Sequence, residues 1–183
     1  WTLLVFCAAL TGAALAGNAP TVGEQLVSIR LETPAASTAR QYLGLPPGET
    51  FDPVEIDGRL LVIEIFSMYC PHCQREAPTV NRLFQAIDAS DRLRGHVKMI
   101  GIGVGNSAFE VGHFKKHYDI SFPLFPDEDF AIHQAVGEVR TPFFIIVRIG
   151  SPDKGRILWT GLGRLPAVET VINRLKTLME RGE

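Results

Sequence analysis

A short apolar run followed at once by two cysteines limits the fold of this chain most strongly. Residues 60–66 read Leu-Leu-Val-Ile-Glu-Ile-Phe, and Cys70, Pro71, His72 and Cys73 follow closely. An apolar run with little alternation predicts a strand that is buried on both faces, as in a parallel sheet. Proline is well tolerated in the first turn of a helix, and apolar residues at helical spacing follow the second cysteine. The sequence therefore predicts a buried strand and a helix with a C-x-x-C motif at their junction.

Strand and helix patterns alternate along the rest of the chain. This alternation predicts an α/β fold with a parallel sheet, and a closing hairpin adds an antiparallel edge. We expect Pro78 to interrupt the helix after the cysteines. The further strands are expected at 97–104, 122–125, 143–149 and 156–160, and the further helices at 108–118, at 129–136 and from Pro166 onward.

The N-terminal part differs in composition from the remainder. Residues 1–16 contain no charged residue and end in Ala-Leu-Ala, which predicts a signal peptide with its cleavage site. A membrane anchor and a buried apolar helix are the alternatives. Residues 17–53 are expected to form an N-terminal extension of loops, a short helix and one edge strand. Residues 54–183 are expected to form one domain.

The number of cysteines limits their possible roles. Cys7 lies in the apolar N-terminal segment and leaves the mature chain if that segment is cleaved. The remaining pair is too small for a disulfide scaffold and cannot alone supply the four ligands of a structural zinc site. A helix N-terminus stabilises a thiolate, so Cys70 is the expected nucleophile. Cys73 lies one turn deeper and is expected to resolve a mixed disulfide.

Two titratable residues beside the cysteines suggest how their chemistry is tuned. His72 can stabilise the Cys70 thiolate by a hydrogen bond or by positive charge, or it can be an exposed helix residue with no such role. Glu64 stands inside the apolar strand, where burial raises the pKa of a carboxyl group. Glu64 is therefore a candidate proton acceptor for Cys73, unless it lies at the strand end and reaches water.

Other patterns argue against several function classes. The formal net charge is −2, whereas nucleic-acid binding needs a clear basic excess. His113 and His117 have the spacing of metal ligands but no evident third ligand, so we expect no metal site. The glycine-rich end of strand 97–104 lacks the spacing and the acidic residue of a dinucleotide-binding loop.

The motifs resemble those of a known superfamily. The stretch from Glu64 to Cys73 resembles the active site of DsbA-type proteins, which share C-P-H-C and an acidic residue six positions before the first cysteine. Pro78 resembles the proline in the active-site helix of thioredoxins, and Thr141-Pro142 resembles the cis-proline that faces the two cysteines. Residues 97–136 are similar to the TlpA and ResA group, which resembles peroxiredoxins in this segment. The resemblance implies a thioredoxin-like fold with a central mixed sheet flanked by helices and a helix-strand insertion in the middle.

The resemblance also implies a function. It implies a periplasmic or otherwise extracytoplasmic thiol–disulfide oxidoreductase, either an oxidant or a reductant, for example in cytochrome c maturation. The cysteine pair carries the electrons without a diffusible cofactor, the substrates are cysteine-containing proteins, and a membrane redox partner resets the pair. A cis Pro142 brings the backbone of Thr141 beside the sulfurs, where an extended substrate can pair with it, and Tyr69 borders that surface. The alternatives are a thiol peroxidase and a non-catalytic binding module with a structural disulfide.

Overall fold

A computed structural model describes residues 18–181, and its centre is a five-stranded mixed sheet. The strand order is β5-β4-β3-β6-β7, with β3, β4 and β5 parallel and with β6 and β7 joined as an antiparallel hairpin at the opposite edge. The predicted signal peptide or anchor at 1–16, with Cys7, lies outside the described residues. The strands are β3 (Leu60–Phe66), β4 (Val97–Val104), β5 (Leu124–Asp127), β6 (Phe143–Arg148) and β7 (Ile157–Leu162).

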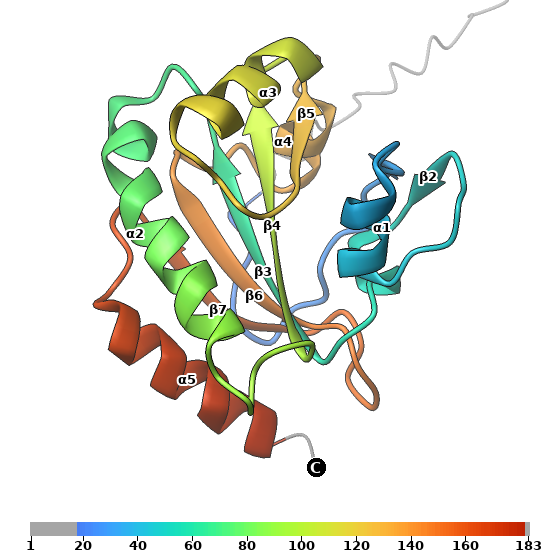
Figure 1. Cartoon of the computed structure of the whole chain (residues 1–183), viewed down its shortest axis with the longest axis vertical. Coiled ribbons are helices and arrows are strands. Elements are labelled where there is room, and N and C mark those ends of the chain that lie inside the picture. The colour runs from blue at the N-terminus through green and yellow to red at the C-terminus, as the bar shows by residue number, and fades with distance from the viewer. Residues whose placement is uncertain (1–17, 182–183) are drawn as a thin grey trace, which may run out of the picture.

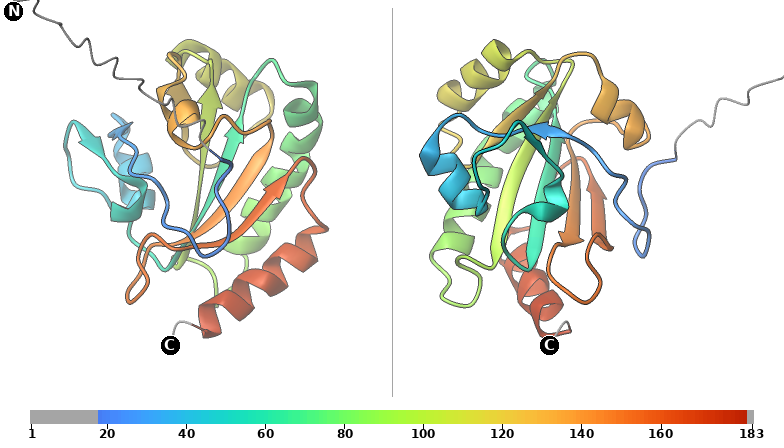
Figure 2. Two further views of the ribbon diagram at one scale, coloured as in Figure 1. Left: turned by 180° about the vertical axis from the view of Figure 1, so that it is seen from behind. Right: turned by 90° about the vertical axis from the view of Figure 1, so that its right-hand side faces the viewer.

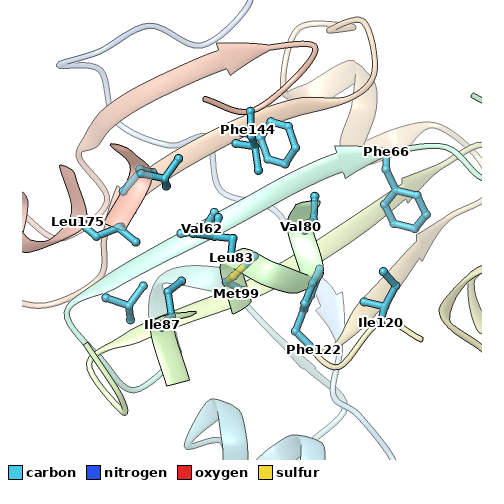
Figure 3. Close-up of a cluster of buried hydrophobic side chains, with 14 of the residues drawn as sticks. Val62, Phe66, Val80, Leu83, Ile87, Met99, Ile120, Phe122, Phe144 and Leu175 are labelled. Carbon is cyan, nitrogen blue, oxygen red and sulfur yellow. The ribbon is translucent and has the colours of Figure 1, made fainter. Parts of the chain in front are cut away.

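Three helices cover one face of the sheet. They are α2 (Pro71–Asp88), α3 (Ala108–His117) and α5 (Val168–Glu180). Helices α2 and α5 lie side by side along this face (Figure 1). The core beneath them is apolar and includes the fully buried Leu83 (Figure 3). This packing fixes α2, and with it the cysteine pair, against the end of β3.

The N-terminal part of the described chain covers the other face. It contains β1 (Leu31–Glu32), α1 (Ser37–Leu43), β2 (Thr50–Phe51) and the 3-10 helix η1 (Pro53–Glu55), and α4 (Ala131–Ala135) packs on the same side (Figure 2). The segment predicted as an N-terminal extension therefore folds onto the sheet and completes its second core. A domain boundary at residue 54 stays a prediction.

Alternation along β3 decides which side chains reach the active-site helix. Leu61, Ile63 and Ile65 belong to the core beneath the N-terminal part, whereas Val62 and Phe66 belong to the core beneath α2. Successive side chains of a strand point to opposite faces, so Glu64 lies on the same face as Val62. The only acidic residue of β3 is thus placed beneath the helix that carries the cysteines.

The central fold prediction is confirmed. The elements α3, β5 and α4 stand between β4 and β6, which is the expected insertion in a thioredoxin-like mixed sheet. Helix α3 begins at a capping box, in which the Ser107 hydroxyl accepts the backbone N–H of Glu110 and the Glu110 carboxylate accepts the backbone N–H of Ser107. Strand β5 begins at Leu124, two residues later than expected, and the fully buried Phe122 lies in the connection before it. Within residues 18–181, no helix is long and apolar enough to cross a membrane.

Candidate functional site

The two cysteines lie where β3 passes into α2. Cys70 is the N-cap residue of α2, and its backbone N–H donates to the carbonyl oxygen of Ser67 at 3.0 Å. Pro71 is the first helical residue, as expected from its fixed φ. Cys70 is half-buried and Cys73 is fully buried, and both thiols are free. The sequence-predicted order of an accessible first cysteine and a deeper second one is therefore present.

A loop from another part of the chain faces Cys70. The Thr141–Pro142 peptide bond is cis, as expected, and the Cys70 thiol donates to the carbonyl oxygen of Thr141 at 3.3 Å. Partial burial raises the pKa of Cys70, but hydrogen bonds from the Thr141 side chain, from Cys73 and from the backbone N–H of His72 outweigh it. The pKa of Cys70 is therefore below its usual range, which increases the thiolate fraction that reacts with disulfides.

Cys73 and Glu64 form the buried side of the site. Burial raises the pKa of Cys73 above its usual range, and the nearby Cys70 and Glu64 raise it further because an additional negative charge is unfavourable there. Glu64 is only 3% exposed, and burial, with a smaller contribution from Glu76, raises its pKa to about 8. Glu64 therefore does not reach water at a strand end, and its carboxyl group interacts electrostatically with the thiol of Cys73.

The two predicted residues on the outer side of the motif are exposed. The Nδ1 atom of His72 lies 3.0 Å from Nη2 of Arg75, and since a guanidinium only donates, Nδ1 is the acceptor. His72 contributes its backbone N–H, rather than its ring, to the hydrogen bonds of the Cys70 sulfur. Tyr69 is 63% exposed, and its hydroxyl donates to the Glu110 carboxylate at the start of α3.

Three polar residues around the motif were missed by the sequence reasoning. Oδ1 of the fully buried Asn106 accepts the backbone N–H of Met68 at 2.8 Å, and Nε2 of Gln74 donates to the Met68 carbonyl at 2.8 Å. These two amides hold the loop between β3 and α2. Glu76 is 5% exposed and accepts the backbone N–H of Leu165 at 3.1 Å. Helical spacing from Cys73 places Glu76 on the buried face of α2, so a signal for its burial was available.

Two hollows flank Tyr69 at the surface. One, of about 610 Å³, is lined by residues that include Met68 and the exposed Phe109. The other, of about 510 Å³, lies between Tyr69, Phe130 and the loop that carries Thr141. Aromatic and polar side chains thus line the surface on both sides of Tyr69, next to the cis-proline loop.

The described residues contain no group of three or more His, Cys, Asp or Glu side chains that could hold a metal ion. His113 and His117 stack with their ring centroids 6.0 Å apart on α3.

Comparisons with known proteins agree with this arrangement. The chain is 25% identical over 100 residues to the thiol-disulfide oxidoreductase ResA of Halalkalibacterium halodurans, which covers 55% of this chain and 54% of that protein. The chain thus spans about half the length of this relative. It is 22% identical over 138 residues to ResA of Bacillus subtilis, covering 74% of this chain and 70% of that protein.

Solved structures show the same fold. A secreted disulfide oxidoreductase of Mycobacterium tuberculosis, homologous to E. coli DsbE, superposes with a TM-score of 0.56 at 20% identity, covering 71% of this chain and 90% of that one. The AhpC/TSA family matches residues 32–159, which is the larger part of the chain and includes both cysteines. The protein has a thioredoxin-like fold and belongs to the AhpC/TSA family.

Proposed function

We propose that this protein is an extracytoplasmic thiol–disulfide oxidoreductase that exchanges disulfides with substrate proteins through Cys70 and Cys73. The observation that carries the proposal is the position of Cys70. Its sulfur lies at the N-terminus of α2, 3.3 Å from the Thr141 carbonyl oxygen, and its pKa is lowered while that of Cys73 is raised. Because of this asymmetry, Cys70 is the nucleophile that attacks the substrate, and Cys73 remains a thiol until it resolves the mixed disulfide.

The two cysteines complete an exchange by themselves. In the reducing direction, the Cys70 thiolate attacks one sulfur of a substrate disulfide, and the other substrate sulfur leaves as a thiolate. Cys73 then loses its proton and attacks Sγ of Cys70, which releases the second substrate thiolate and leaves a Cys70–Cys73 disulfide. The substrate gains two electrons and the enzyme loses two, so no diffusible cofactor is needed. The oxidising direction is the reverse of these steps.

Glu64 supplies a destination for the proton of Cys73. Once Cys70 is in a mixed disulfide, its negative charge is gone, and the thiol of Cys73 loses its proton more easily. Glu64 is buried on the face of the sheet that α2 covers, and its pKa of about 8 suits proton transfer near neutral pH. In this proposal Glu64 is the base that activates Cys73 and the acid that returns its proton.

The cis-proline loop and Tyr69 act on the substrate side. The backbone at Thr141 and the cis Pro142 offers an extended substrate segment a place to pair beside the sulfurs. Tyr69 is held by Glu110 between two hollows, where it can contact substrate side chains. Pro71 fixes the first turn of α2. His72 favours the reduced form of the cysteine pair through the hydrogen bond from its backbone N–H to the Cys70 sulfur.

The relatives support the cellular setting of the proposal. The similar Mycobacterium tuberculosis protein is secreted, and the two bacterial relatives are named thiol-disulfide oxidoreductase ResA. We therefore propose that the protein acts in the periplasm or elsewhere outside the cytoplasm. Its substrates are cysteine-containing proteins, and a membrane redox partner resets the cysteine pair.

Trapping the intermediate tests this function. The probe is a peptide with two cysteines, supplied separately in its disulfide form and its dithiol form and followed by mass spectrometry. Reduced Cys73→Ser protein should accumulate a mixed disulfide with the disulfide peptide, whereas Cys70→Ser should form none and the wild type should complete the exchange. A wild type that exchanges with neither form would refute the proposal. A wild type that consumes hydrogen peroxide faster than it exchanges peptide disulfides would favour a thiol peroxidase instead.

A further inference from the structure

A groove of about 750 Å³ runs beside the active-site helix and takes no part in the chemistry proposed above. It lies between α2 and the connection from β7 to α5, two segments that are neighbours on the same face of the sheet (Figures 1 and 2). Three arginines line it: Arg75 and Arg82 from α2, and Arg164 from the connection. The whole chain has a formal net charge of −2, so this local gathering of cations does not follow from the composition.

The three arginines are available to an external anion. Nη2 of Arg75 contacts the ring of His72 at 3.0 Å, and Nη2 of Arg82 donates to Oγ1 of Thr79 at 3.1 Å. Among residues 18–181, none of the three guanidinium groups forms an ion pair with a carboxylate. A guanidinium group has five donors in a planar fork, so most of the donors of these side chains remain free for a carboxylate ligand.

The two carboxyl groups in the groove do not neutralise it. Glu76 is buried and accepts the backbone N–H of Leu165; burial raises the pKa of its carboxyl group, whereas the positive charges of Arg164 and Arg82 act to lower it. Glu169 lies in the first turn of α5, where a carboxylate is stabilised by the positive end of the helix. Three arginines therefore share the groove with two carboxyl groups, one of them buried, so that the cations outnumber the anions there.

The groove begins at the active site. Arg75, at its near end, contacts His72, which stands between the two cysteines. At 1.5 Å per residue, Arg82 lies about 14 Å along the helix from Cys73 and about 18 Å from Cys70. An extended peptide covers about 3.3 Å per residue, so about four to six residues separate a substrate cysteine at Cys70 from a side chain that reaches Arg82.

We propose that this arginine groove binds an acidic segment of the substrate protein, about four to six residues from the cysteine that reacts with Cys70. The inference rests on the proposed exchange function and adds a recognition rule to it. Charge complementarity selects the occupant, because three guanidinium groups, none of which forms a close ion pair among the described residues, favour carboxylates and disfavour basic segments. The groove would thus select among substrate proteins without touching the reacting sulfurs.

Two peptides test the rule. Each has the same central disulfide, and one has Glu-Asp-Glu five residues away on both sides, where the other has Gln-Asn-Gln. We expect the wild type to exchange with the acidic peptide about tenfold faster at low salt, with the preference reduced in 0.5 M NaCl. In the double variant Arg82→Gln, Arg164→Gln the ratio of the two rates should fall toward one. Arg92→Gln removes an exposed arginine that pairs with Glu180 outside the groove, and it should keep the wild-type ratio.

The possible outcomes distinguish a failure of the arginine groove from a failure of the proposed disulfide-exchange function. If the wild type exchanges both peptides at equal rates, the proposed recognition of acidic segments is refuted and the exchange function remains intact. A preference that survives in the double variant, or that falls equally with Arg92→Gln, also refutes this recognition, because the selectivity then arises from general charge. If neither peptide exchanges with the wild type, the exchange function and the groove both fall. The neutral peptide reports in each variant whether the cysteine pair is still active.

Discussion

Replacing Glu64 by Gln separates the charge of this buried carboxyl group from its shape. Glu64 is 3% exposed, and burial raises its pKa from an ordinary value of 4.5 to about 8. The folded protein therefore keeps a proton that the unfolded chain has already lost between these two pH values. Its free energy of unfolding should fall as the pH rises through this range, and this loss is complete above the folded-state pKa. Below the unfolded-state pKa both states are protonated and Glu64 has no such effect.

The magnitude follows from the two pKa values. The difference between 4.5 and about 8 corresponds to about 5 kcal/mol when both states are ionised. Between pH 5 and pH 8 the wild type should lose about 3–4 kcal/mol that Glu64→Gln does not lose. The amide has its own burial cost, but that cost is independent of pH, so only the pH-dependent difference tests the argument.

Urea denaturation of the reduced proteins at pH 5 and pH 8 measures this difference. Glu64→Gln should gain stability relative to the wild type as the pH rises. The control Glu49→Gln changes an exposed carboxylate and should follow the wild type at both pH values. An equal difference between Glu64→Gln and the wild type at pH 5 and pH 8 would refute the reasoning, since the folded-state pKa of Glu64 would then be ordinary.

Three further outcomes are expected. Iodoacetamide should alkylate Cys70 well before Cys73 in the reduced protein at pH 7, because only Cys70 is accessible with a lowered pKa; equal labelling in peptide mass spectra would contradict the assignment of roles. Asn106→Ala should lower the free energy of unfolding by about 1–3 kcal/mol, since the Met68 N–H loses its acceptor, and an unchanged urea midpoint would show that this bond is dispensable. Leu83→Ala should cost about 2–5 kcal/mol in the same assay, and a loss well below 1 kcal/mol would contradict a closely packed core.

Buried parallel strands were predictable with their bounds. Strands β3 and β4 begin and end at the residues expected from the sequence, because both faces are covered and nearly every position is apolar. Glycines tolerate this burial where neighbours come close: a Cβ on Gly101 would meet Leu124 at 2.5 Å. The apolar run therefore ends where the buried sheet ends.

The N-terminal part was harder to predict. Its buried residues include Leu26, Ile29 and Leu31, whose spacing fits neither a helix nor a long strand. They contact the sheet mostly from an irregular backbone. In this part of the described chain the regular pairing consists of the two-residue ladder of β1 and β2, which includes Leu31, and an isolated bridge between Gln25 and Arg156. Sequence periodicity indicates only helices and strands. A segment that packs on the sheet with little regular secondary structure therefore gives no such signal, and its burial becomes evident only from the sheet face that it covers.

The part of the site formed by residues adjacent in the sequence was predictable. The C-x-x-C motif follows β3 directly, so the sequence alone placed both cysteines at the start of α2. Asn106 reaches the loop through space, since 38 residues separate it from Met68. Its glycine-rich surroundings indicated no role in the site. Contacts of this kind depend on strand order, which the local sequence does not contain.

The equilibrium between the Cys70–Cys73 disulfide and a glutathione redox buffer tests the central claim most directly. Quantifying the oxidised fraction by thiol alkylation and mass spectrometry gives the reduction potential. A redox-active pair should equilibrate with a potential between about −120 mV, typical of DsbA, and about −270 mV, typical of thioredoxin, and its position in that range gives the direction of electron flow. A disulfide with a potential below about −300 mV, which resists reduction by glutathione, would be structural and would contradict the proposed function.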